Sequence, residues 1–148
     1  DLYIEQCGAA DRVPHYDTGA PNLHRLGDWA SRPADPFNDF EPVDSSAAAI
    51  AAQGLLRFGR RTKTKKYWQA GLTVLQTLLD EPYLSTSPKH EGLLLHSVYH
   101  WPNRWDYVPR GARTPRGESS LWGDYHLREV ALYVQRIATG KPYLKFFR

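Results

Sequence analysis

Two adjacent segments with helical periodicity dominate the sequence. The first is expected to be capped by Asp44 or Ser45, whose side-chain oxygen can accept a hydrogen bond from a free backbone N–H, and to end at Gly59. The second covers residues 64–79 after a short turn, so the two helices should pack as an antiparallel hairpin. One face of each is apolar at helical spacing: Ala47, Ile50, Ala51, Leu55 and Phe58, then Trp68, Leu72, Leu75 and Leu79.

A third long helix is predicted from Ser119 or Ser120 to about Thr139, with Gly140 ending it. Its apolar residues cover most of the circumference, so we expect it to lie buried between two layers. The first ten residues look like the end of a further helix.

The remaining segments are rich in proline and predict loops. Five prolines interrupt residues 11–43 and three interrupt residues 101–117, which excludes long helices and central strands there. The apolar run Gly92–His100 is either a strand or a buried extended piece, because periodicity alone does not separate the two. The pattern as a whole predicts an all-α fold with long loops.

Composition limits the classes of function. A chain of 148 residues with 41% hydrophobic residues predicts one globular domain, so residues 1–148 are treated as a single unit. The longest stretch without Asp, Glu, Lys or Arg has 13 residues, too few for a membrane-spanning helix. No leader is visible and the first residue is not Met, so we expect a longer or processed product of undetermined compartment. The net charge of +3 comes mainly from residues 57–66, where solvated helix ends explain it better than nucleic-acid binding.

The sequence gives little support for a metal-binding site or for a nucleophilic catalytic residue. His96 and His100 are four residues apart, but no helix is predicted beneath them, and His90 lacks the second histidine of an HExxH motif. Cys7 cannot form an intrachain disulfide, since it is the single cysteine, and no partner for it as a nucleophile is evident. Asp44 and Asp124 are most simply explained as favourable charges at helix N-termini.

Aromatic residues are frequent, with five tryptophans and nine tyrosines. Trp68 and Trp122 fall at helical spacing with other apolar residues and are expected in the core. Trp29, Trp101 and Trp105 lie in polar loops and are expected at a surface or cleft, where flat rings can stack on the apolar faces of sugars.

Four blocks then resemble one enzyme family in the same order. Asp44–Leu56 (DSSAAAIAAQGLL) resembles the DSSAAAIAAxGLL helix of glycoside hydrolase family 88, the unsaturated glucuronyl hydrolases. Val13–Pro21 resembles the family's VPYWDFDAP segment, and Gly92–His100 resembles its GLLLHGxYH. Trp122–Tyr125 with Glu129 resembles the WGDYxxxEAL of its last helix.

The resemblance implies that the chain is the C-terminal part of an (α/α)6 toroid of helical hairpins. Such enzymes remove terminal 4,5-unsaturated uronic acid from lyase-generated oligosaccharides by protonating and hydrating a vinyl ether, without a metal or organic cofactor. The two aspartates credited with this chemistry belong to the N-terminal portion, so no catalytic residue is assigned here. The implied partners are the oligosaccharide and the missing N-terminal part or a partner chain, with no nucleic acid and no membrane.

The resemblance also implies substrate-binding residues. Tyr99 matches a tyrosine of the pocket, and the following loop matches a segment that contacts the leaving sugar. Sulfate-preferring members have a SxxSxK pattern there, which this chain lacks, and residues 22–43 form a longer stretch than usual that is expected to reshape the cleft mouth. The implied set is Tyr99, His100, Trp101, Asn103, Arg104 and Trp105.

Two alternatives remain open. One is a non-catalytic sugar-binding or interaction module on the same scaffold, since an incomplete toroid would expose an apolar seam that favours association. The other is the related unsaturated rhamnogalacturonyl hydrolase group, from which the DSSAAAIAA and GLLLH blocks point away.

Overall fold

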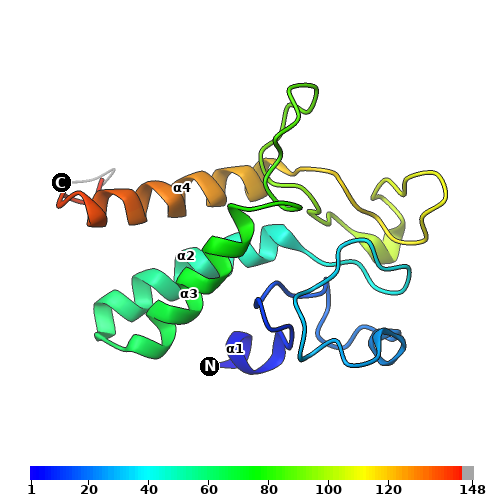
Figure 1. Cartoon of the computed structure of the whole chain (residues 1–148), viewed down its shortest axis with the longest axis horizontal. Coiled ribbons are helices and arrows are strands. Elements are labelled where there is room, and N and C mark those ends of the chain that lie inside the picture. The colour runs from blue at the N-terminus through cyan, green and yellow to red at the C-terminus, as the bar shows by residue number, and fades with distance from the viewer. Residues whose placement is uncertain (145–148) are drawn as a thin grey trace.

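A computed structural model describes residues 1–144 and shows an all-helical architecture (Figure 1). Within that range the only β pairing consists of isolated bridges between His15 and Val43 and between Leu84 and Leu94. The predicted all-α fold is confirmed. The helices are α1 (Leu2–Gln6), the 3-10 helix η1 (Leu23–Leu26), α2 (Ser45–Thr62), α3 (Lys65–Leu78), the 3-10 helix η2 (Trp101–Asn103) and α4 (Leu121–Ala138).

The α2–α3 hairpin forms as predicted, but α2 does not end at Gly59. It continues to Thr62, and Lys63 closes it in the left-handed conformation with φ 58°. Gly59 serves a different purpose, because a Cβ atom there would lie 2.6 Å from the backbone nitrogen of Trp68. Its missing side chain therefore allows α2 and α3 to approach closely.

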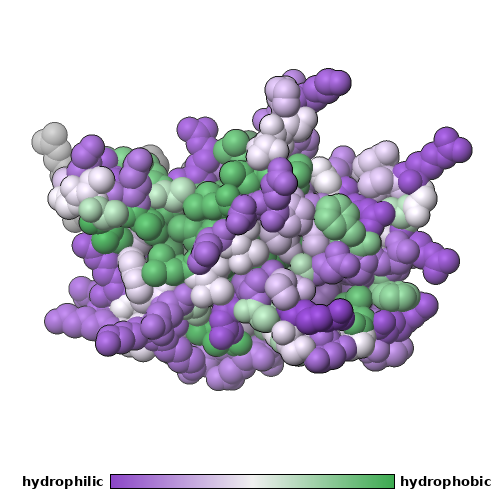
Figure 2. Space-filling model, viewed as in Figure 1, coloured by the Kyte–Doolittle hydropathy of each residue, from purple (hydrophilic) through white to green (hydrophobic). Residues whose placement is uncertain are grey.

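Helix α4 packs with one side on the α2–α3 hairpin, mainly against α2 and to a smaller extent against α3. Gly123, Leu127, Val130 and Tyr133 are its buried residues. The expectation of burial between two layers is wrong for this chain, since Leu121 is 87% exposed and Leu132 is 40% exposed. Figure 2 shows apolar surface along this helix, which no other described segment covers.

The segment from Gly92 to His100 is an extended piece rather than a strand of a sheet. Leu94, His96 and Val98 are buried along it, while Tyr99 is exposed at its end. It lies against the N-terminal ends of both α2 and α4, as the hydrogen bonds below show. No helix among residues 1–144 has the length and apolar character that crossing a membrane requires.

Candidate functional site

The N-terminus of α2 fixes the end of the extended segment. The Asp44 carboxylate caps the helix by accepting from the N–H groups of Ser46 at 2.9 Å and Ala47 at 3.3 Å. The same oxygen accepts from Val98 N–H at 3.4 Å. Burial raises the pKa of Asp44, and its hydrogen bonds partly offset this effect. The cap predicted from the sequence is thus also the anchor for the residues that precede Tyr99.

Two serines complete this junction. The Ser45 hydroxyl donates to the carbonyl of Leu95 at 2.6 Å. The hydroxyl of Ser46 accepts from the indole N–H of Trp122 at 3.0 Å. The DSS sequence therefore positions both the extended segment and the first turn of α4.

A carboxylate closes the loop that follows Tyr99. Asp106 accepts from the backbone N–H of Tyr99 and, at 2.9 Å, from that of His100. Inside the loop, His100 Nδ1 accepts from Asn103 N–H at 3.3 Å, and the Arg104 guanidinium lies 4.2 Å from the centre of the Trp101 ring system. Asp106 thus holds the loop in a closed turn.

This turn brings Tyr99 and Trp105 together beside a third aromatic ring, Trp122 of α4. The rings of Tyr99 and Trp105 are stacked with centroids 5.6 Å apart and an interplanar angle of 27°. The ring of Tyr99 also lies 5.5 Å from that of Trp122, at an interplanar angle of 42°. Tyr99 and Trp105 are each 61% exposed, and Trp122 is 38% exposed. We call these three residues the aromatic row.

Two open hollows flank the aromatic row. The first, of about 210 Å³, is lined by Tyr16 and Asp44 together with residues 98–102. The second, of about 440 Å³, lies between Tyr99, Asp106 and the start of α4. Residues 22–43 line neither of them, so the long loop does not extend into these two hollows.

The predicted binding residues gather on this surface to different degrees. Tyr99, His100 and Trp101 line the first hollow, and Trp105 extends the row. Asn103 and Arg104 are exposed on the turn itself. Their roles in binding remain predictions.

Sequence reasoning missed two residues of this site. Trp122 was expected in the core, yet it is exposed beside Tyr99 because α4 is covered on one side only. Asp106 had no motif to mark it, and only the folded loop shows that its carboxylate holds Tyr99 and His100.

His96 is a structural residue beneath the site. Its ring is 3% exposed, and Nδ1 accepts from Gly117 N–H at 3.2 Å. Edge-to-face contacts join it to Phe37 at 5.2 Å and Tyr83 at 5.8 Å. Burial lowers its pKa to about 4, which keeps the imidazole neutral near pH 7. Among residues 1–144, no group of three His, Cys, Asp or Glu side chains is arranged to hold a metal ion.

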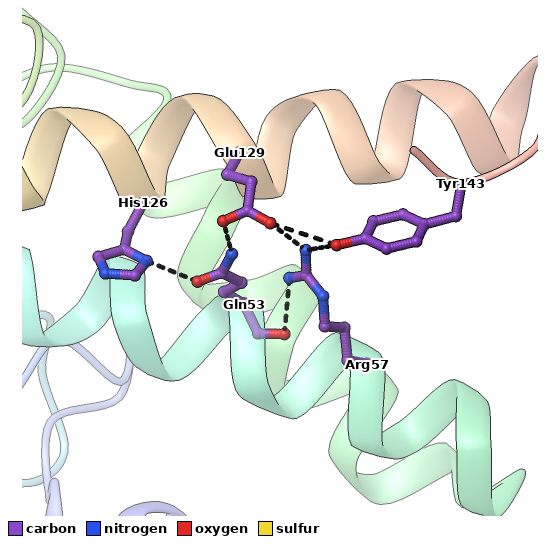
Figure 3. Close-up of polar contacts among 5 residues, drawn as sticks. All are labelled: Gln53, Arg57, His126, Glu129 and Tyr143. Carbon is purple, nitrogen blue, oxygen red and sulfur yellow. Dashed lines mark hydrogen bonds and ion pairs between the residues drawn. The ribbon is translucent and has the colours of Figure 1, made fainter. Parts of the chain in front are cut away.

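A polar network farther along the helices ties α2 to α4 (Figure 3). The Glu129 carboxylate accepts from the side-chain amide of Gln53, from Arg57 at 2.5 Å and from the Tyr143 hydroxyl at 3.3 Å. The other end of Gln53 hydrogen-bonds to His126 Nδ1 at 2.5 Å. Glu129, the last residue of the WGDY block, therefore fixes the alignment of the two helices that bear the site.

Comparison with known proteins gives two matches, while no family model matches the chain. An unsaturated glucuronyl hydrolase of Formosa agariphila is 33% identical over 99 residues, which are 64% of this chain and 22% of that protein. The crystal structure of an unsaturated glucuronyl hydrolase specific for heparin superposes with a TM-score of 0.69 at 22% identity. That superposition covers 93% of this chain and 32% of the other.

The chain thus spans about a fifth of the curated relative and about a third of the solved structure. The sequence match shows a similarity to an unsaturated glucuronyl hydrolase. The structural match shows the fold, which is that of an (α/α)6 toroid. The chain is therefore similar in sequence, over 99 residues, to an unsaturated glucuronyl hydrolase, and it shares the all-α fold of part of another.

Proposed function

We propose that this chain forms part of the substrate cleft of a glycoside hydrolase. Its substrate is an oligosaccharide, produced by a polysaccharide lyase, that carries a terminal 4,5-unsaturated uronic acid. The aromatic row carries the proposal, because three exposed rings held together give an apolar surface on which a sugar can pack. The names of both matched proteins support the choice of an unsaturated uronyl substrate.

The reaction is hydration of a vinyl ether followed by collapse of a hemiketal. A proton adds to C4 of the C4=C5 double bond, and water adds to C5, which bears the ring oxygen. The resulting hemiketal opens the ring and leaves a hemiacetal at C1, whose collapse to an aldehyde releases the reducing sugar. We assign neither the proton donor nor the base to this chain. In our proposal the two aspartates that perform these steps in the family come from the remainder of the toroid, and no cofactor takes part.

The binding residues have distinct roles in this proposal. Trp105 stacks on a sugar with the ring face that Tyr99 does not cover, while Tyr99 and Trp101 line the first hollow. His100 and Asn103 shape the turn through their mutual hydrogen bond. Arg104, held over the Trp101 ring, offers a cation to the carboxylate of an acidic sugar.

The remainder of the toroid is expected to cover the exposed side of α4. Leu121, Tyr125 and Leu132 are exposed large apolar side chains on that helix. In our proposal the N-terminal part of the same product, or a partner chain, packs there. The 148-residue chain alone is accordingly expected to bind substrate weakly and not to hydrolyse it.

A non-catalytic sugar-binding module is the second candidate. The observation in its favour is that the aromatic row is complete within this chain, although the chain spans only 22% of the curated relative. The two candidates differ in turnover, since a binding module engages the unsaturated sugar without consuming its double bond.

The test is a kinetic assay of the native gene product on an unsaturated uronyl disaccharide, following the loss of ultraviolet absorbance from the double bond. Trp105→Ala should raise KM by roughly 2- to 10-fold, the equivalent of one lost aromatic stacking contact. Tyr107→Ala is the matched control, because Tyr107 is also an exposed loop aromatic but lies outside the aromatic row. Binding without turnover would support the module instead, and equal effects of the two variants would remove the proposed role of the row.

A further inference from the structure

The loop between residues 25 and 40 lines a further pocket of about 570 Å³, to which His15 adds one wall. This volume lies within the range of small-molecule binding sites. None of its lining residues lines either hollow of the aromatic row. His15 and Tyr16 are neighbours at the bridge to Val43, yet His15 lines this pocket and Tyr16 lines the first hollow. Consecutive side chains of an extended segment point to opposite sides, so the pocket is a separate site.

Contacts outside the loop hold this pocket in shape. Trp29 packs on Gly8, where an added Cβ atom would lie 2.1 Å from Cζ3 of the indole. Gly8 also has φ 77°, which a residue with a side chain adopts only with strain. The indole meets the His15 ring edge-on at 5.2 Å. On the far side of the loop, Thr114 Oγ1 donates to the carbonyl of Asn38 at 2.6 Å.

The pocket walls contain aromatic rings and two arginine side chains whose N–H groups are not all hydrogen-bonded. Trp29, Phe37 and Phe40 supply the rings. The Arg25 guanidinium lies over the Phe40 ring at 4.3 Å, and within residues 1–144 it takes part in no ion pair. Arg32 donates from Nε and Nη2 to carbonyls of its own loop, at 3.1 Å each, which leaves further N–H groups available.

Acceptors in the same lining balance these donors. Asp35 and Asp39 offset the formal charges of the two arginines, so the lining is neutral overall. Asp35 Oδ1 accepts from the backbone N–H of Phe37 at 2.8 Å, and its second oxygen remains an acceptor. His15 is 7% exposed, and its Nδ1 has no hydrogen-bond partner among the described residues. A neutral lining that contains both donors and acceptors fits an uncharged polyhydroxylated ligand better than an anion.

We propose that this pocket binds a neutral pyranose sugar, with the apolar C–H face of the sugar against the aromatic walls and its hydroxyl groups shared between Arg25 and Asp39. Guanidinium and carboxylate groups suit neighbouring hydroxyls because one donates and the other accepts. The site is independent of hydrolysis in the cleft: it recognises a sugar through residues of the long loop, whether or not the chain belongs to an active enzyme.

The test is an NMR titration of the ¹⁵N-labelled protein, observing the tryptophan indole N–H signals. The neutral probes are methyl β-galactopyranoside and methyl β-glucopyranoside, and glucuronate is the acidic comparison. At least one neutral probe should shift the Trp29 signal saturably and more strongly than glucuronate does. Arg25→Gln and Asp39→Asn should each weaken this binding at least tenfold, and both residues are exposed, so the fold should survive.

Trp105→Ala is the control that separates this site from the cleft, and it should leave the Trp29 titration unchanged. Saturable shifts confined to Trp105 and Trp122 would assign sugar binding to the aromatic row and overturn the proposal. A response to glucuronate alone would make the pocket an anion site, which also contradicts it. Unchanged affinity in both Arg25→Gln and Asp39→Asn would exclude the proposed hydroxyl contacts.

Discussion

Three aspartate carboxylates hold the extended segment in place by accepting hydrogen bonds from its backbone N–H groups. Asp124 was explained by the helix dipole, but its two oxygens also accept from the backbone N–H groups of Leu93 at 2.9 Å and Leu94 at 2.8 Å. Asp44 and Asp106 hold the same segment farther along, at Val98 and Tyr99. Three carboxylates thus fix the extended piece that presents the aromatic row.

Asp124→Ala is expected to destabilise the 148-residue chain by about 1–3 kcal/mol, because two backbone donors lose their acceptor. Urea denaturation followed by circular dichroism measures this change. Glu118→Ala is the control, since the Glu118 side chain is exposed and makes no hydrogen bond in the described structure. Equal midpoints for the two variants would show that Asp124 does not hold the segment.

His96 predicts a pH dependence of stability. Its pKa is about 4 in the folded chain and near 6.5 when unfolded, so the unfolded chain binds the proton more tightly. The contribution of His96 is therefore complete above pH 6.5 and is lost as the pH falls from there towards 4. His96→Asn, which tolerates the φ of 67°, should show a shallower loss of unfolding free energy over this interval. Parallel pH profiles would contradict the buried neutral imidazole.

At the scale of elements, the starts of α2 and α4 were predictable because a capping residue precedes a helical pattern in each. Asp44 and Ser120 accept from backbone N–H groups at the starts of α2 and α4 as the sequence suggested. The end of α2 was not predictable from Gly59, since a glycine that ends a helix and one that allows close packing look alike in sequence. The exposure of α4 was equally hidden, because periodicity reveals which residues are apolar but not which neighbours cover them.

The two glycines of α2 give a matched pair of substitutions. Gly59→Ala should destabilise the hairpin by about 1–3 kcal/mol, because its Cβ would lie 2.6 Å from the Trp68 backbone nitrogen. Gly54→Ala should stabilise the chain by up to about 1 kcal/mol, since nothing lies within 4 Å and alanine favours a helix. Thermal denaturation of both variants checks the signs. A stabilising Gly59→Ala would contradict the close helix contact.

At the scale of the whole molecule, the exposed side of α4 predicts self-association of the isolated chain. Leu132→Lys should lower the weight-average mass at high protein concentration in sedimentation equilibrium, because it interrupts the apolar surface. Gln69→Lys, an exposed change on α3, adds the same charge elsewhere and should leave association unchanged. If both variants associate like the parent chain, this face of α4 is not the contact surface.

The candidate site was predictable only in part. The GLLLH block located Tyr99 and its loop, because the likeness to family 88 spans those residues. The partners of Tyr99 come from distant positions: Trp122 reaches it from the start of α4, and Asp106 must close the loop before Trp105 can stack. These are tertiary relations, which local pattern does not encode.

In our proposal this chain is one part of a longer hydrolase whose remaining hairpins complete the toroid. The first measurement to make is the intact mass of the native gene product, purified from its source. We predict a mass of at least about twice the 16.9 kDa of this chain, in keeping with its coverage of 32% of the solved structure. A native product of 16.9 kDa would contradict the claim and favour a sugar-binding module instead.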